Sequence, residues 1–135
     1  MSPSFFDSNV VLYLLSGDAA KADRAEALLE AGGVISVQVL NEVASVCRRK
    51  LKMPWAEIDA LLLAVKTACE IVPLTVASHE KAVEVAKRFQ LSIYDAHIVA
   101  TALLCGAEVL FTEDMQSGMR IDGLTLQNPF LPDQP

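Results

Sequence analysis

The stretch LSIYDAHIVATALLCGAEVLFT, residues 91–112, decides the fold. From Ala96 to Cys105 almost every residue is apolar or small, which is typical of a helix buried on all sides. The run AEVLFT that follows predicts a strand ending at Thr112. A buried helix that leads directly into a strand is typical of a fold in which helices cover a parallel sheet.

Asp95 stands in the first turn of this apolar helix and needs an explanation. Ser92 and Asp95 have the S-x-x-D spacing of a capping box, in which the serine hydroxyl accepts a backbone N–H and the carboxylate reaches back. This structural explanation requires no chemistry. The alternative is a carboxylate in a functional site, and only partners elsewhere in the chain can decide between the two.

The rest of the chain alternates strands with helices. Strands are predicted for SPSFFD, for VISV, for EIVPLT at or near a sheet edge because of its proline, and weakly for RIDGLTLQNPF. Helices are predicted for residues 9–16, 19–31, 38–50, 76–89 and for WAEIDALLLAVKTACE, whose apolar face is wide enough to need cover from two directions. This order predicts one domain over residues 1–135, an α/β fold of three layers (α/β/α) with a central, mainly parallel sheet.

Composition narrows the class of protein. With 53% hydrophobic and 21% charged residues, the chain has the composition of a compact globular domain. Its first residues lack a basic segment, and Asp7 interrupts them before the length of a signal or membrane span, so we expect a cytoplasmic protein without membrane association. Cys47, Cys69 and Cys105 fall on apolar positions and are predicted to be reduced core residues.

The net charge of −6 argues against binding nucleic acid through bulk electrostatics, although it does not exclude binding through cations. Positive charge is concentrated in RRKLK, residues Arg48 to Lys52. This segment either contacts phosphates or complements the dipole at the end of a helix, and the sequence leaves both alternatives open.

Four acidic residues lie at the ends of predicted elements. Asp7 ends the first strand, and Asp114 follows the strand that ends at Thr112. Asp95 opens the buried helix, and Glu42 lies within two turns of VISV. Because the carboxyl ends of parallel strands face a common crevice, we expect these four side chains to converge.

Convergence of carboxylates has an electrostatic cost. Two of them about 4 Å apart repel by about 4 kcal/mol at an effective dielectric of about 20, so the cluster requires protonation or cations. Asp7, Asp95 and Asp114 have no Lys or Arg within four positions in sequence. Oxygen ligands without Cys or His favour Mg²⁺ or Mn²⁺, and such a centre suits phosphodiester hydrolysis.

The segments FFDSNVVLYLL, YDAHIVATALLCGAEVLFTEDM and GLTLQNPF, together with the helix of Glu42, resemble those of PIN-domain nucleases. In length and order the chain is similar to the VapC-type toxins of bacterial toxin–antitoxin pairs. The resemblance implies an Mg²⁺- or Mn²⁺-dependent endoribonuclease that cuts RNA, inhibits translation as a toxin, forms a homodimer and is held by a small antitoxin near its active site. It implies that the metal-binding, catalytic residues are Asp7 of DSN, Glu42, Asp95 of the D-A-x-I-x-A-T-A helix and Asp114 of T-x-D.

Two departures from the family pattern affect the assignment of residues. His97 stands where the family often has an apolar residue, and we expect it to be packed or to support the site indirectly. Glu113 adds a carboxylate beside Asp114, and the T-x-D spacing favours Asp114. Thr112 and Asn9 are candidates for hydrogen bonds to the ligands.

Two alternative functions are weighed against this one. A haloacid-dehalogenase-like phosphatase also has an aspartate after its first strand, but it would need a second aspartate where Asn9 stands and a phosphate-binding lysine. A PIN fold kept only as a non-catalytic interaction module would have no reason to gather four acids that repel one another.

Overall fold

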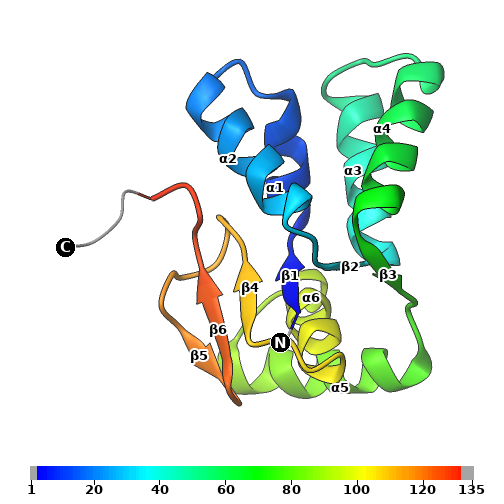
Figure 1. The fold of residues 1–135 in the computed structure, drawn as a ribbon. Coiled ribbons are helices and arrows are strands. Elements are labelled where there is room, and N and C mark those ends of the chain that lie inside the picture. Colours follow the sequence, from blue (N-terminus) through cyan, green and yellow to red (C-terminus); the bar gives the residue numbers. More distant parts are fainter. Residues whose placement is uncertain (1–2, 132–135) are drawn as a thin grey trace.

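A computed structural model describes residues 3–131 and contains a six-stranded sheet covered by helices (Figure 1). The strands are β1 (Ser4–Phe6), β2 (Val34–Ser36), β3 (Glu70–Val72), β4 (Val109–Phe111), β5 (Arg120–Ile121) and β6 (Leu124–Gln127). The helices are α1 (Ser8–Leu12), the short 3-10 helix η1 (Tyr13–Leu15), α2 (Ala19–Glu30), α3 (Val37–Arg49), α4 (Trp55–Ala68), α5 (Val76–Phe89) and α6 (Ile93–Leu104).

The sheet has the strand order β3-β2-β1-β4-β6-β5, in which only β5 is antiparallel to its neighbour. The chain moves from β1 through β2 to β3 in one direction and then crosses back to β4 on the other side of β1. Because parallel crossovers are right-handed, the helices of the first two crossovers and those of the third lie on opposite faces of the sheet. This confirms the predicted three-layer α/β/α fold with a mainly parallel sheet.

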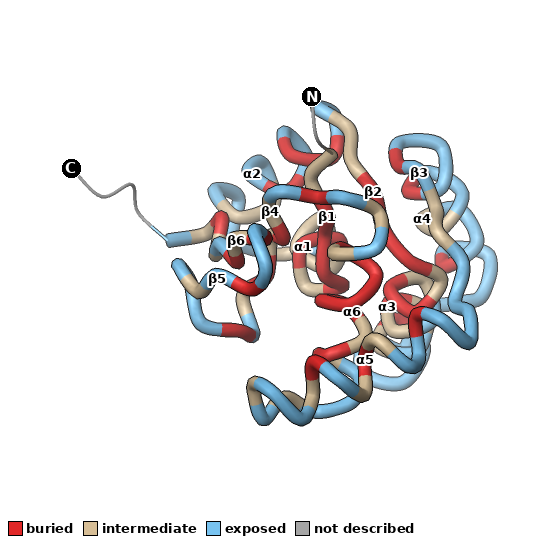
Figure 2. Tube along the Cα trace, turned by 90° about the horizontal axis from the view of Figure 1, so that it is seen from below, coloured by how far each residue is buried: buried red, intermediate tan, exposed pale blue. Residues whose placement is uncertain are grey.

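The layers are visible when the molecule is viewed from below. In Figure 2 the strands are seen nearly end-on and follow one another across the view from β5 to β3, with α2 on one side of this row and with α5 and α6 on the other. The buried residues gather along the strands and on the inner faces of the helices. The reversal of direction beside β1 makes the carboxyl ends of β1 and β4 the topological switch point of the sheet, where open α/β sheets bind their ligands.

Strands β1 and β4 are neighbours in register, with Phe6 opposite Phe111 and their rings stacked at a centroid distance of 5.9 Å. The next residue of each strand therefore emerges at the same edge. The backbone N–H of Asp7 donates to the carbonyl oxygen of Phe111 at 3.0 Å, which fixes Asp7 beside the end of β4.

Helix α6 begins as its sequence predicts. The Ser92 hydroxyl accepts the backbone N–H of Asp95 at 3.1 Å, which satisfies one free donor of the first turn. The residues from Ala96 to Ala102 are almost all buried, whereas Tyr94 is 69% exposed at the start of the helix. The Ser92 half of the capping box is thus present, and it leaves the Asp95 carboxylate available for other contacts.

The structure departs from the sequence expectations in two places. The first helix begins at Ser8 and tightens into η1 after Leu12, instead of running regularly over residues 9–16. The expectation that α4 is covered from two directions is wrong, because α4 buries Ile58 and Val65 but leaves Leu63 64% exposed. The physical reason is that α4 packs on α3 and α2 from one side, while its other side faces outward.

Gly33 precedes β2 at a point of very close packing. A Cβ atom at this position would lie 2.5 Å from Cε2 of Phe6 and 2.7 Å from the carbonyl oxygen of Ser4. We expect Gly33→Ala to lower the free energy of unfolding by about 1–3 kcal/mol, because strand β1 must shift to admit the methyl group. Gly17→Ala, where a Cβ meets nothing within 4 Å, is the matched control in urea unfolding. Equal midpoints for the two variants would contradict this account.

Two further findings concern residues 3–131. None of the helices described there combines the length and apolar character that a bilayer-spanning segment requires. Cys47 and Cys69 are buried and Cys105 is half-buried, all with free thiols. Burial raises the pKa of the Cys69 thiol to about 11, which keeps it protonated and unreactive at neutral pH.

Candidate metal centre

Asp7 lies at the topological switch point of the sheet, between the end of β1 and the start of α1. It is the N-cap residue of α1, and its Oδ1 accepts the backbone N–H of Ser8 at 2.6 Å. Its Oδ2 accepts the hydroxyl of Thr112 at 2.8 Å. Only 2% of Asp7 is exposed, so these bonds hold an almost fully buried carboxylate in one orientation.

Asp114 lies on the loop that follows β4. Its backbone N–H donates to the hydroxyl oxygen of Thr112 at 3.2 Å, and its Oδ2 accepts the side-chain amide of Asn9 at 3.1 Å. The hydroxyl of Thr112 therefore connects Asp114 to Asp7. Asn9 donates from the first helix, at the position where a haloacid-dehalogenase-like phosphatase would need its second aspartate.

Glu42 projects from the second turn of α3 toward the same place. Its Oε2 accepts the hydroxyl of Ser8 at 2.9 Å, and the same hydroxyl lies 3.3 Å from Oδ1 of Asp7. Its Oε1 accepts the side-chain amide of Gln38 at 2.8 Å. Gln38 also donates to the carbonyl oxygen of Tyr94 at 2.8 Å, which ties α3 to the first turn of α6.

Asp95 completes the group from the first turn of α6, where it is half-buried. Burial raises the pKa of its carboxyl, and the charges of Asp114 and Glu42 raise it further. The hydrogen bond with Ser92 acts in the opposite direction. Asp95 is therefore within electrostatic reach of two other members of the group, although the four residues are far apart in sequence.

The strongest electrostatic effect falls on Asp7. Burial raises the pKa of its carboxyl from 3.8 to about 6, and the negative charges of Glu42 and Asp114 add to that increase. The hydrogen bonds from Thr112 and Ser8 oppose it. An ionised Asp7 is thus unfavourable in the protein alone, and a nearby cation would relieve this cost.

The carboxylates of Asp7, Glu42 and Asp114 accept hydrogen bonds, but none of the four carboxylates has a cationic partner among residues 3–131. In that same range no three Asp, Glu, His or Cys side chains stand close enough together to hold a metal ion as they are oriented. The structure therefore brings the quartet into one electrostatic cluster but not into a finished ligand cage.

The donor set of this cluster fits a hard divalent cation. It offers carboxylate oxygens without thiolate or imidazole nitrogen, which is the choice of ligands for Mg²⁺ and Mn²⁺. The bonds from Ser8, Gln38, Thr112 and Asn9 orient these oxygens, as partners of metal ligands commonly do.

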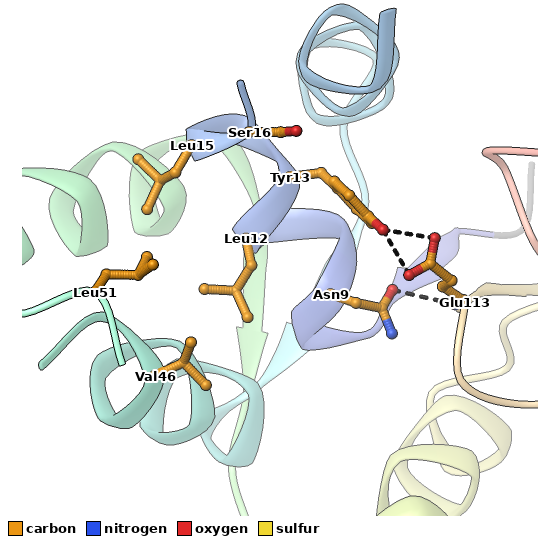
Figure 3. A pocket seen from close by; sticks show the side chains of 8 residues that line it. All are labelled: Asn9, Leu12, Tyr13, Leu15, Ser16, Val46, Leu51 and Glu113. Atoms are coloured by element: carbon orange, nitrogen blue, oxygen red, sulfur yellow. Dashed lines mark hydrogen bonds between the residues drawn. The ribbon is translucent and has the colours of Figure 1, made fainter. Parts of the chain in front are cut away.

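Glu113 has its own partners, away from the cluster. Its carboxylate accepts the hydroxyl of Tyr13 at 2.6 and 2.7 Å (Figure 3). It also lies 3.8 Å from the ammonium of Lys21. Its backbone N–H donates to Oδ1 of Asn9 at 3.2 Å. Of the two neighbouring acids, only Asp114 contributes charge to Asp7 and Asp95, which supports the choice of Asp114 as the ligand.

His97 takes no part in the cluster. Its Nε2 lies 2.8 Å from the hydroxyl of Ser78 in the first turn of α5, and burial lowers its pKa, which favours the neutral imidazole. This agrees with the expectation of a packed residue. His79 is exposed on α5.

Sequence reasoning missed Ser8 and Gln38 as parts of this site. A signal existed for Gln38, since a polar residue four positions before Glu42 lies on the same side of the helix. Ser8 directly follows Asp7, but nothing in the sequence indicated that its hydroxyl bonds to a residue 34 positions away.

This chain is similar to a known protein family and to several solved structures. The family model of the PIN domain matches residues 4–117. A chain in a toxin–antitoxin complex from Klebsiella pneumoniae is 25% identical with a TM-score of 0.72, over 94% of this chain and 98% of that chain. No curated protein gave a significant match.

Two further solved structures share the fold at lower identity. VapC20 from Mycobacterium tuberculosis, a sarcin–ricin loop cleaving toxin, is 20% identical with a TM-score of 0.64, over 82% of this chain and 89% of that chain. DNA-bound VapBC from Salmonella typhimurium is 16% identical with a TM-score of 0.72, over 96% of this chain and 99% of that chain. The family model extends from β1 past Asp114 and includes all four carboxylates, and on this match the chain belongs to the PIN-domain family.

Proposed function

We propose that this chain is a metal-dependent endoribonuclease that hydrolyses RNA phosphodiester bonds and serves as the VapC-type toxin of a toxin–antitoxin pair. One observation carries the proposal: four carboxylates of a PIN-family chain share one electrostatic cluster at the carboxyl edge of the sheet, without a cationic partner in residues 3–131. The likeness to a chain of the K. pneumoniae toxin–antitoxin complex supports the toxin role. We place the activity in the cytoplasm, as a single domain over residues 1–135.

We assign the binding of Mg²⁺ or Mn²⁺ to the carboxylates of Asp7, Glu42, Asp95 and Asp114. When bound, a divalent cation supplies Lewis acidity for the attacking water, the phosphate and the leaving oxygen. Thr112 and Ser8 hold the Asp7 carboxylate in one orientation, and Asn9 steadies the loop of Asp114 from α1. These residues orient the ligands, and the low exposure of Asp7 limits competition by water.

We assign antitoxin binding to the apolar pocket between α1, η1 and α3. This pocket has a volume of about 310 Å³ and opens beside Asn9 and Glu113, next to the acidic cluster (Figure 3). The apolar residues that line it are Leu12, Leu15, Val46 and Leu51. An apolar side chain of a bound antitoxin segment would fill this space and place the following residues over the catalytic carboxylates.

The two neighbouring acids after β4 provide a matched test of the proposal. We expect sequencing of RNA 5′ ends, after expression in bacteria, to show new cleavage sites with the wild type and with Glu113→Gln but none with Asp114→Asn. The reason is that Asp114 faces the acidic cluster, whereas Glu113 bonds to Tyr13.

Circular dichroism spectra of both purified variants control for folding. An RNA end profile of Asp114→Asn that matches the wild type would overturn the catalytic assignment. The absence of new ends from all three proteins, at equal expression and without antitoxin, would overturn the nuclease function itself.

A further inference from the structure

The side of α3 that carries Glu42 is polar along its whole length. Gln38, Glu42, Ser45 and Arg49 follow one another at intervals of four, three and four residues, so they lie on one side of the helix. From Glu42 to Arg49 the helix rises by about 10 Å. A track of polar groups therefore leads from the acidic cluster to the end of α3.

A pocket of about 450 Å³ lies on this track beside Glu42. It is bounded by α3, by the residues at the start of α5 and by the first turns of α6, with Asn41, Ser45, Leu74, His79 and Tyr94 among its lining. Tyr94 is 69% exposed, and its phenol forms no hydrogen bond with any residue from 3 to 131. Gln38 holds the carbonyl oxygen of Tyr94 at 2.8 Å, so the backbone that presents this free ring is fixed.

Basic residues lie next to this pocket, at the C-terminal end of α3. Four of the 11 Lys and Arg residues lie within Arg48 to Lys52. Arg49 and Lys50 line a second hollow of about 270 Å³, which shares Ser45 with the first. Their side chains form no ion pair or hydrogen bond with another residue of the described range.

Arg48 differs from these two. Its guanidinium donates to the carbonyl oxygen of Met53 at 3.1 Å and lies over the Trp55 ring at 5.3 Å from its centroid. Arg48 therefore supports the turn between α3 and α4, whereas Arg49 and Lys50 remain available for a ligand.

We propose that single-stranded RNA lies along this side of α3, with one base in the pocket beside Glu42 stacked on the Tyr94 ring and with the phosphates beyond it held by Arg49 and Lys50. The inference rests on the proposed nuclease function and names its substrate-binding surface. In a chain of net charge −6 whose catalytic cluster is itself acidic, a polyanion needs positive charge close to the site, and this pair supplies it in the hollow that adjoins the pocket of Glu42.

The pocket also favours single-stranded over duplex RNA. A base reaches an aromatic side chain in a lateral pocket only when it is unpaired and turned out of its stack. An exposed ring accepts any base by stacking, while an amide such as that of Asn41 contacts the base edge. The surface therefore suits a loop or an unpaired segment of a structured RNA.

RNA binding by anisotropy tests this surface in the Asp7→Asn background, which keeps the RNA intact. The probe is a fluorescein-labelled, mixed-sequence single-stranded RNA oligonucleotide, titrated at several salt concentrations. Arg49→Gln and Lys50→Gln are each expected to weaken binding and to reduce the slope of log K against log salt by about 0.7. Lys66→Gln, on the exposed side of α4, is the matched control with unchanged binding.

Tyr94 requires its own pair of variants. Tyr94→Ala is expected to weaken binding about tenfold without changing the salt slope, and Tyr94→Phe should restore binding because stacking needs only the ring. Light scattering checks that neither variant alters the oligomeric state. An altered oligomeric state would overturn the assignment of an RNA base to this pocket and place Tyr94 at an interface between copies of this chain.

Other outcomes separate this inference from the proposed function. Binding by Arg49→Gln and Lys50→Gln that equals that of Lys66→Gln would overturn the phosphate contacts. Normal RNA binding by Arg49→Gln and Lys50→Gln, combined with loss of antitoxin binding by the same variants, would show that these two residues contact a protein partner instead. RNA cleavage by the wild type, with an unchanged KM in Arg49→Gln, Lys50→Gln and Tyr94→Ala, would support the nuclease function and overturn only this RNA-binding surface.

Discussion

RNA cleavage by the Asp95→Asn variant is expected to be slower than that of the wild type by about a hundredfold or more. Loss of a partner that merely orients a metal ligand commonly costs 10- to about 100-fold, and loss of a ligand charge costs more. Asparagine keeps the size of the side chain but removes the negative charge that Asp95 shares with Asp114 and Glu42. Single-turnover cleavage of total bacterial RNA in Mg²⁺ or Mn²⁺ measures the loss.

This variant should remain folded, which makes the result interpretable. The helix cap at Ser92 uses the backbone N–H of Asp95 and is unaffected by the change of side chain. Asp59→Asn is the matched control, because Asp59 is exposed on α4, far from the cluster. Cleavage by Asp95→Asn at the rate of Asp59→Asn would exclude Asp95 from the catalytic group.

The second large effect concerns stability without metal. Asp7 has a pKa of about 6 in the folded protein against 3.8 in the unfolded chain, so between these pH values the folded state holds a proton that the unfolded state has lost. The free energy of unfolding must therefore fall as the pH rises from about 4 to about 6, by about 3 kcal/mol from this group. Above that interval Asp7 contributes no further change. Urea unfolding in chelator across pH 4 to about 8 measures this dependence.

Replacement of the Asp7 carboxylate by an amide should remove this loss of stability. Without metal at pH 8, Asp7→Asn is expected to be more stable than the wild type, with a melting temperature higher by about 5 °C or more. Added Mg²⁺ or Mn²⁺ should stabilise the wild type and have little effect on this variant, because a ligand that binds only the folded state raises its stability. A wild type whose stability is flat with pH and insensitive to both metals would contradict the acidic cluster.

The sequence was sufficient to predict the fold because its signals for the ends of strands and helices are strong. Pro73 indicated a strand at an edge, and β3 is indeed one of the two edge strands of the sheet. The S-x-x-D spacing at Ser92 predicted where α6 begins, and the apolar stretch after it predicted a buried helix. Alternating strands and helices then left few topologies open, since right-handed crossovers restrict the order of a parallel sheet.

The acidic cluster could be anticipated for a related reason. Asp7 and Asp114 follow neighbouring parallel strands, and such positions meet at one edge of the sheet. What the sequence could not give is the set of long-range hydrogen bonds. The contact of Ser8 with Glu42 depends on how α3 packs on α1, and no local pattern encodes that packing.

The misjudged cover of α4 has a comparable cause. Hydrophobic periodicity reports which positions are apolar, but not whether another element is present to cover them. Leu63 and Trp55 are apolar and exposed, because α4 lies at the outside of the helix layer. The exposure of these side chains depends on how the helices and the sheet are arranged in layers, and local periodicity gives no information about that arrangement.

Crystals of the wild-type protein grown with Mn²⁺ provide the most direct test of the metal centre. Anomalous diffraction is expected to locate Mn²⁺ at the carboxyl ends of β1 and β4, with carboxylate oxygens of Asp7, Asp95 and Asp114 at about 2.0–2.4 Å. The carboxylate of Glu42 is the fourth ligand expected at this ion. The absence of an anomalous peak there at saturating Mn²⁺, with Asp7 and Asp114 still bonded only to Thr112 and Asn9, would contradict the account.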